Sequence, residues 1–185
     1  MPRVTLIGYR GTGKSTVAAL LGEALGCGWC DADATLERKL GVTIAKLVRD
    51  AGEPRFRDEE ETVLAELLEG FPGVVATGGG VVLRPANRAL LRRAGRPIVW
   101  RTATAAAVRR RLAADPTTAD RRPALTSAGG DPLAEVEAML EHREPLYREC
   151  ADVRFDTSAM PPDETVARIV SWLEDARAVV RENEP

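Results

Sequence analysis

The sequence predicts an α/β fold in which a five-stranded parallel sheet is covered by helices on both faces. Short apolar runs alternate with longer segments of helical periodicity along the chain, a pattern typical of parallel sheets. The chain has 185 residues, of which 44% are hydrophobic and 29% charged, as expected for a single globular domain spanning 1–185. This composition excludes a disordered chain, a collagen-like repeat and a disulfide scaffold.

Each predicted element follows from a local pattern. The five predicted strands are the apolar runs at 4–8, 28–31, 74–77, 98–101 and 153–155. The predicted helices cover 14–25, 35–70 with breaks near Gly41 and Gly52, 85–94, 103–112, 132–149, and a last segment from Pro161 or Pro162 to 180. Within the helix at 132–149, Pro145 predicts a kink because proline lacks the backbone N–H of the helical ladder.

The segment at about 112–125 is a candidate lid, binding loop or disordered segment. It overlaps a polar stretch, 114–130, that is rich in Asp, Thr, Pro and Gly and contains Arg121 and Arg122. Connections of this length without secondary structure are usually lids, binding loops or disordered segments.

Charge is distributed unevenly along the chain. The 26 basic and 28 acidic residues give a formal net charge of -2. Residues 84–122, however, hold 11 arginines, no lysine and two acids, a local charge of +9. This block suggests a polyanionic partner, and solvated helix faces are the alternative explanation. Only three basic residues are lysines: Lys14, Lys39 and Lys46.

Cysteines and targeting signals add little. Cys27 and Cys30 form a C-x-x-C pair without further zinc ligands at a suitable spacing, and Cys30 does not open a helix, so we expect inert thiols. The sequence shows no apolar leader and no run of about 18 apolar residues. We therefore expect a cytoplasmic protein that does not span a membrane.

The first predicted strand leads into a phosphate-binding motif. Residues 8–16, Gly-Tyr-Arg-Gly-Thr-Gly-Lys-Ser-Thr, match G-x-x-x-x-G-K-[ST] between a strand and a helix. Glycines let backbone N–H groups surround phosphates, Lys14 reaches the β and γ phosphates, and the Ser15 hydroxyl binds magnesium. The dinucleotide fingerprint fails, because Thr16 replaces its last glycine. The motif predicts a protein that binds a magnesium nucleotide.

Missing motifs favour phosphoryl transfer over hydrolysis. The chain has no Asn-Lys-x-Asp guanine motif, since its only asparagines are Asn87 and Asn183. Neither the third nor the fourth predicted strand ends in the Asp or Asp-Glu with which hydrolytic motors hold magnesium and polarise water. Transfer to an acceptor is therefore the favoured reaction.

Two carboxylates follow the second predicted strand, at Asp31 and Asp33. Because side chains alternate along a strand, both are predicted to point the same way. Beside a magnesium nucleotide, one can organise the water shell of the metal while the other accepts a proton or hydrogen bond from a substrate hydroxyl. The alternative is that Asp33 only caps the following helix.

Three later segments add candidate ligand-binding residues. Arg57 and Glu60 lie three residues apart on a predicted helix, which also fits a simple intrahelical ion pair. Residues 77–80, Thr-Gly-Gly-Gly, follow the third strand, where glycine allows either close approach to a ligand or a tight turn. Arg143 lies in an otherwise core-facing helical stripe that ends at Tyr147, and such an arginine suggests a buried anion.

Taken together, these segments resemble the shikimate kinase family. The matching segments are 8–16, Asp31-Ala-Asp33 with Leu36-Glu37, Gly52-Glu-Pro, Phe56-Arg57 with Glu60, Thr77 to Gly80, Arg122-Pro123, and Arg143-Glu-Pro-Leu-Tyr147. They span nearly the whole chain, and their order and spacing are specific. The resemblance implies a three-layer P-loop kinase of the nucleoside-monophosphate-kinase type, with a substrate-binding helical region at about 33–62 and a closing lid.

The resemblance also implies a reaction and residue roles. The family transfers the γ-phosphoryl group of ATP to the 3-hydroxyl of shikimate, on the route to chorismate and the aromatic amino acids. ATP phosphates would bind to Gly11, Thr12, Gly13, Lys14, Ser15 and Thr16, and Mg²⁺ to Ser15 with Asp31 acting through water. Shikimate would bind to Asp33, Arg57, Gly78, Gly79, Gly80 and Arg143, with the arginines holding its carboxylate. Arg110 would lie by the adenine, and the catalytic residues would be Lys14, Asp33 and Arg122.

Two features depart from the family pattern. The segment between Arg111 and Arg122 is longer than in many members, which leaves open whether Arg121 or Arg122 contacts the transferred phosphate. Arg101, at the end of the fourth predicted strand, stands where a less charged residue is expected. Neither departure touches the motifs on the substrate side.

Other functions fit parts of the sequence. Gluconate, another polyol or a nucleoside monophosphate could be the acceptor, the basic block could bind nucleic acid, or the chain could be a catalytically silent shikimate sensor. Arg57 and Arg143 favour a carboxylate-bearing acceptor, and the block lacks the exposed aromatics of specific RNA modules. We expect a monomeric small-molecule kinase that binds neither nucleic acid nor membranes.

Overall fold

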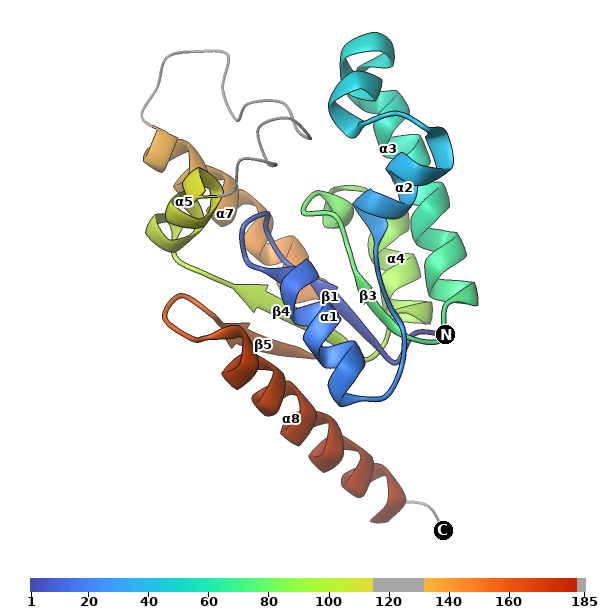
Figure 1. Cartoon of the computed structure of the whole chain (residues 1–185), viewed down its shortest axis with the longest axis vertical. Coiled ribbons are helices and arrows are strands. Elements are labelled where there is room, and N and C mark those ends of the chain that lie inside the picture. The colour runs from blue at the N-terminus through green and yellow to red at the C-terminus, as the bar shows by residue number, and fades with distance from the viewer. Residues whose placement is uncertain (115–131, 183–185) are drawn as a thin grey trace.

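A sheet of five parallel strands forms the centre of the protein (Figure 1). The structure, a computed structural model, describes the backbone of residues 1–114 and 132–182 and the side chains of 1–114 and 135–176. The strands are β1 (Val4–Ile7), β2 (Trp29–Asp31), β3 (Val74–Ala76), β4 (Ile98–Thr102) and β5 (Val153–Asp156). Their spatial order is β2-β3-β1-β4-β5, and all neighbouring pairs are parallel.

The carboxyl ends of the strands meet at one edge of the sheet. In the central strand β1, Leu6 lies opposite Ala76 of β3 and Val99 of β4. Asp31, the last residue of β2, is level with the same Ala76. Ligands of such sheets bind beyond the carboxyl ends of the strands. The loop after β1 and the carboxylates after β2 therefore belong to one candidate site.

Helices cover both faces of this sheet (Figure 1). They are α1 (Lys14–Ala24), α2 (Ala32–Leu40), α3 (Ile44–Gly70), α4 (Pro85–Ala94), α5 (Ala105–Ala114), α7 (Pro132–Cys150) and α8 (Pro162–Glu182), with a short 3₁₀ turn η1 (Val81–Leu83). Leu6 and Val99 pack with α1 and α8 in one buried cluster. Ile7 and Trp100 pack with α3, α4 and α7 in another. The predicted three-layer α/β fold is confirmed, and alternation along each strand explains the two clusters.

Glycines divide the helical region between β2 and β3 as predicted. Gly41 ends α2 with φ of 67°, and Gly52 interrupts α3 with φ of 83° and ψ of 163°. Other residues rarely adopt these conformations. The helix after β2, however, begins at Ala32 and not at 35 as predicted, because Asp31 caps it by accepting a hydrogen bond from the backbone N–H of Ala34 at 3.1 Å.

Other segments differ from the predictions or lie outside the described residues. The turn η1 after β3 was not predicted, and α7 continues through Pro145 to Cys150. The predicted lid at 112–125, including Arg121 and Arg122, lies outside the described residues except for 112–114 at the end of α5.

Two further features concern the thiols and the helices of the described residues. Cys27 and Cys30 are unpaired, and burial raises the pKa of Cys30 to about 11, which disfavours a reactive thiolate. In the described part of the chain, no helix combines the length and apolar character that crossing a bilayer requires.

Candidate active site

The phosphate loop after β1 is held in shape by its own side chains. Gly13 precedes α1 in a left-handed conformation with φ of 77°. Lys14 turns back over the loop, and its Nζ donates to the carbonyls of Gly8 at 2.8 Å and Tyr9 at 3.0 Å. Thr12 Oγ1 donates to the same Tyr9 carbonyl at 2.7 Å. An anion at this loop would meet an ammonium group and a helix N-terminus together.

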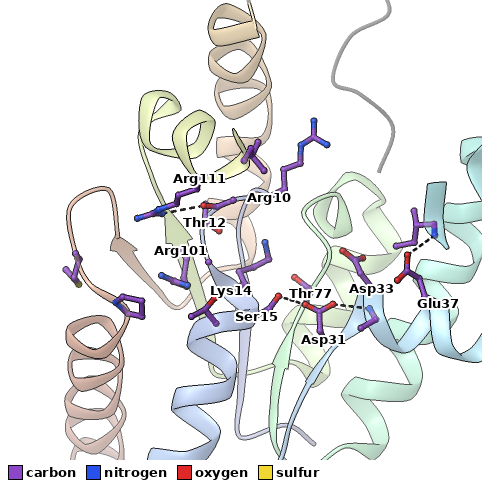
Figure 2. A pocket seen from close by; sticks show the side chains of 18 residues that line it. Arg10, Thr12, Lys14, Ser15, Asp31, Asp33, Glu37, Thr77, Arg101 and Arg111 are labelled. Carbon is purple, nitrogen blue, oxygen red and sulfur yellow. Dashed lines mark hydrogen bonds between the residues drawn. The ribbon is translucent and has the colours of Figure 1, made fainter. Parts of the chain in front are cut away.

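A cavity of about 450 Å³ lies beside the phosphate loop (Figure 2), within the size range of small-ligand sites. All the predicted phosphate-binding residues at 11–16 line it, together with Asp31 and Asp33. Thr77, which follows β3, and Arg101, near the end of β4, also line the cavity. The cavity thus joins the ends of four neighbouring strands.

Ser15 and Asp31 form a hydrogen-bonded pair in this cavity (Figure 2). One Asp31 oxygen accepts from the Ser15 hydroxyl, while the other caps α2. The capping role that was considered for Asp33 therefore belongs to Asp31. Asp33 lies in the first turn of α2, so strand alternation does not position it, yet both carboxylates line the cavity. Adjacent hydroxyl and carboxylate oxygens fit a hard cation such as Mg²⁺.

No metal site made of protein groups alone is present among the described residues. They contain no group of three His, Cys, Asp or Glu side chains that could hold a metal ion. A cation near Ser15 and Asp31 would therefore take further oxygen ligands from phosphates or water, as Mg²⁺ commonly does.

The glycines after β3 leave room for carboxylates. A Cβ on Gly78 would lie 2.6 Å from Glu60 Oε1 and 2.7 Å from Asp33 Oδ1, so a side chain here would clash with both. The glycine run thus approaches side chains closely, and it also forms a turn, since the Val81 N–H donates to the Gly78 carbonyl at 3.3 Å. It brings Asp33 from α2 and Glu60 from α3 to the same stretch of backbone.

Arg57 and Glu60 form the predicted ion pair on α3. Arg57 Nη1 lies 2.7 Å from Glu60 Oε2, and Nη2 lies 2.8 Å from Glu53 Oε1. Burial opposes the charge of Arg57, but the two carboxylates outweigh it and raise the pKa of Arg57. The guanidinium faces Gly80, where a Cβ would lie 2.7 Å from Nη2. The pair thus lies against the glycine run after β3, although neither residue is among those that line the cavity beside the phosphate loop.

Arg143 reaches the same glycines from α7. Its Nη1 donates to the Gly79 carbonyl at 3.1 Å, and the Tyr147 hydroxyl donates to the same oxygen at 2.5 Å. The guanidinium lies over the Tyr9 ring, with Cζ 5.3 Å from its centroid. Nε of Arg143 is buried and has no acceptor in the part of the chain that the structure describes. The predicted stripe of α7 faces inward, since Val136 and Tyr147 are buried.

The burial of Glu60 predicts a measurable pH dependence of stability. Burial raises the pKa of Glu60, although Arg57 and Arg143 oppose the shift. An unfolded glutamate titrates at about pH 4.3. Between that value and its raised native pKa, the native protein holds a proton that the unfolded chain lacks, so the free energy of unfolding falls as pH rises. In Glu60→Gln this fall is absent.

Urea unfolding between about pH 4 and pH 8 tests this expectation. The difference in unfolding free energy, Glu60→Gln minus wild type, should increase with pH. A difference that stays constant or decreases would contradict the raised pKa.

Two predicted nucleotide-binding residues are not among the residues that line the cavity. Arg110 is exposed on α5 and lines a separate shallow hollow. Its neighbour Arg111 lines the cavity, and its guanidinium donates to the Thr157 carbonyl. Arg122 lies outside the described residues. The adenine contact of Arg110 stays a prediction.

Sequence reasoning assigned no individual site role to Thr77, Arg101 or Arg111, which all line the cavity. Thr77 belongs to the predicted segment at 77–80, and Arg101 was noted as an unexpected charge at the end of a strand. Arg111 was not singled out, because its position depends on how α5 packs beside the phosphate loop.

Comparisons with known proteins point to one family. The shikimate kinase family model matches residues 10–174. A shikimate kinase from Rhodopirellula baltica is 43% identical over 165 residues, which are 89% of this chain and 87% of that protein. A shikimate kinase from Acinetobacter baumannii, solved in complex with shikimate, has a TM-score of 0.85 at 32% identity and covers 94% of this chain and 93% of its own.

A gluconokinase from Sinorhizobium meliloti covers 98% of this chain and 97% of its own with a TM-score of 0.58. Its identity of 18% shows a shared fold alone. The family model and the R. baltica relative, in contrast, match most of the chain at the level of sequence. This protein belongs to the shikimate kinase family.

Proposed function

We propose that this protein transfers the γ-phosphoryl group of ATP to the 3-hydroxyl of shikimate, giving shikimate 3-phosphate and ADP. The observation that carries the proposal is the meeting of Arg57 and Arg143 around residues 78–80, beside Asp33 and the phosphate loop. Two guanidinium groups next to a carboxylate suit an acceptor that bears both a carboxylate and hydroxyl groups. The reaction belongs to chorismate and aromatic amino-acid biosynthesis.

On the nucleotide side, residues 11–16 bind the phosphates through backbone N–H groups and the Lys14 ammonium. Ser15 and Asp31 hold Mg²⁺, Ser15 directly and Asp31 through water. When bound, the ion neutralises charge on the phosphates. The pairing of the Ser15 hydroxyl with Asp31 supports these roles.

On the acceptor side, residues 33–62 form the substrate-binding helical region. Arg57 and Arg143 bind the carboxylate, the backbone of 78–80 packs against the ring, and Asp33 aligns the attacking hydroxyl and accepts its proton. Asp33 suits this role because it lines the cavity of the phosphate loop and also faces Gly78. It can therefore lie between nucleotide and acceptor.

Arg122 and the lid at 112–125 complete the proposed site. Closure would exclude water, which would otherwise accept the phosphoryl group. Arg122 would then add positive charge near the transferred phosphate. These roles stay predictions that rest on the family resemblance.

The basic block at 84–122 has a simpler explanation than nucleic acid. Of its nine described arginines, five pair with carboxylates: Arg84 with Asp58 and Glu61, Arg88 and Arg92 with Glu149, Arg93 with Glu69, and Arg96 with Asp152. Much of the local charge is therefore compensated within the fold, which weakens the case for a polyanionic partner.

ADP formation from ATP and magnesium tests the proposed function directly. We expect turnover with shikimate and far less with gluconate, AMP or no acceptor. Equal turnover with every acceptor would overturn the choice of substrate. Shikimate binding without ADP formation would instead indicate a silent sensor.

Arg143→Met is expected to raise KM for shikimate about 10- to 100-fold, because a charge-assisted hydrogen bond contributes about 1.5–3 kcal/mol. KM for ATP should change little. Arg148→Met is the matched control, since Arg148 lies on the same helix, is exposed and pairs with Glu144. Steady-state kinetics with each substrate varied in turn measures both constants. An effect on KM for ATP alone would show that Arg143 has another role.

A further inference from the structure

Arg101 is a buried arginine without a charge partner. It is 3% exposed, and no carboxylate among the described residues forms an ion pair with it. Its Nε and Nη1 atoms are buried and find no hydrogen-bond acceptor in the described ranges. Burial lowers the pKa of Arg101 to about 9, and the positive charge of Arg111 adds to this effect. A buried charge in this state is costly unless an anion compensates it.

The strand directs Arg101 toward the phosphate loop. Residues two apart on a strand point to the same face, and Val99 packs in the cluster that includes α1. Arg101 therefore points toward the start of α1. A Cβ on Gly13 would lie 3.2 Å from Arg101 Nη1, so the guanidinium lies directly beside the residue that begins the helix.

The surroundings of Arg101 in the cavity are positively charged. Lys14 and Arg111 line the same cavity, and α1 has neither a side-chain cap at Gly13 nor an acidic residue in its first turn. The N-terminus of α1 thus adds its partial positive charge. These groups together attract an anion. The buried Nε and Nη1 atoms of Arg101 could donate hydrogen bonds to that anion.

Figure 2 shows on which side of the phosphate loop the side chain of Arg101 lies. Arg101 and Arg111 are on one side of the phosphate loop, and Asp31 and Asp33 are on the other. Asp33 faces the acceptor in the proposed function, and Arg101 and Asp33 lie on different sides of the phosphate loop.

We propose that Arg101 is an additional nucleotide-binding residue, whose guanidinium binds a phosphate of ATP and ADP that is not transferred. The inference rests on the nucleotide-binding half of the proposed function. It explains why a charge is tolerated at the end of a buried strand, since the nucleotide supplies the missing counter-charge. Because ATP and ADP both carry the phosphates that are not transferred, this contact strengthens the binding of both nucleotides.

Arg101→Met tests the proposal, since methionine replaces the apolar stem of arginine and removes the charged guanidinium. The variant is expected to bind ADP with magnesium about 10- to 100-fold more weakly by calorimetry, the range of one charge-assisted hydrogen bond. Arg109→Met, which removes an exposed arginine from α5, is the matched control and should bind ADP as wild type does.

Stability should change in the opposite direction. Without nucleotide, the Tm of Arg101→Met should equal or exceed that of wild type, because an uncompensated buried charge is gone. The rise in Tm on adding ADP should be smaller than in wild type. Unchanged ADP affinity would overturn the proposal, whatever the Tm of the variant without nucleotide.

Two further measurements distinguish phosphate binding from general support of the cavity. Adenosine, which has no phosphate, should bind Arg101→Met and wild type equally, and an equal loss for adenosine and ADP would overturn the proposal. Arg101→Lys keeps the charge but loses the planar fork, so its ADP affinity should lie between those of methionine and arginine. If it matched the methionine variant, charge at this position would not matter and the proposal would fail.

The test does not depend on the acceptor. ADP binding is measured without shikimate, so failure of shikimate to stimulate turnover in the wild-type protein would overturn the proposed function and leave the role of Arg101 standing. Normal shikimate kinase activity in the wild-type protein, together with unchanged ADP affinity in Arg101→Met, would overturn the role of Arg101 and leave the proposed function standing.

Discussion

Lys14→Met is expected to lower kcat for shikimate-dependent ADP formation about 10²- to 10³-fold, or about 3–4 kcal/mol in transition-state stabilisation. The Lys14 side chain is only 8% exposed and is held by the carbonyls of Gly8 and Tyr9. A prepositioned ammonium in a site shielded from water stabilises charge on the transferring phosphoryl group without reorganising. Methionine keeps the apolar stem and removes only the charged head.

Lys46→Met is the matched control for this experiment. Lys46 is exposed on α3 and pairs with Asp50 on the surface, so its loss removes the same charge without touching the cavity. Steady-state kinetics and thermal unfolding should be measured for both variants, because Lys14 also holds the loop in shape. A folded Lys14→Met enzyme with kcat within about threefold of wild type would contradict its assignment.

Asp33→Asn is expected to reduce kcat about 10²- to 10⁴-fold, the usual contribution of a positioned general base. Asparagine keeps the size and a hydrogen-bond acceptor but cannot take the proton of the acceptor hydroxyl. KM for ATP should change little, because residues 11–16 bind the phosphates. Steady-state kinetics with saturating shikimate measures the effect on kcat.

The control for Asp33→Asn must separate chemistry from helix stability. Asp33 lies in the first turn of α2, where a carboxylate also stabilises a helix by about 0.3–1 kcal/mol. Asp163 occupies the first turn of α8 and is exposed, so Asp163→Asn makes the same change without entering the cavity. Equal effects of the two substitutions on kcat would show that Asp33 has no chemical role.

Local patterns predicted the fold correctly because its elements are defined over short distances in the chain. Apolar runs marked all five strands, and Gly41 and Gly52 marked both breaks in the helical region. The start of α2 was missed because Asp31 both ends a strand and caps a helix. The turn at 81–83 carries no strong local signal, since it depends on the packing of Val81 and Val82 in the core.

The substrate-side residues were predicted as separate motifs, and only the fold shows how they meet. Arg57, Glu60 and Arg143 come from α3 and α7, which are far apart in the sequence. Their common point is the glycine backbone after β3. The ion pair of Arg57 with Glu60 fits a surface helix equally well in sequence, and only the structure shows that Glu60 is buried and lies close to Gly78.

The sequence by itself determined the phosphate loop, the two carboxylates after β2 and the order of the five strands along the chain, because each depends on adjacent residues. Tertiary structure decided which arginines take part in the site. Of the arginines at 84–122, five lie in described ion pairs with carboxylates, whereas Arg101 is buried beside Gly13 without one. The physical reason is that the role of a charge depends on its burial and on the groups around it, and both are set by packing between elements distant in the chain.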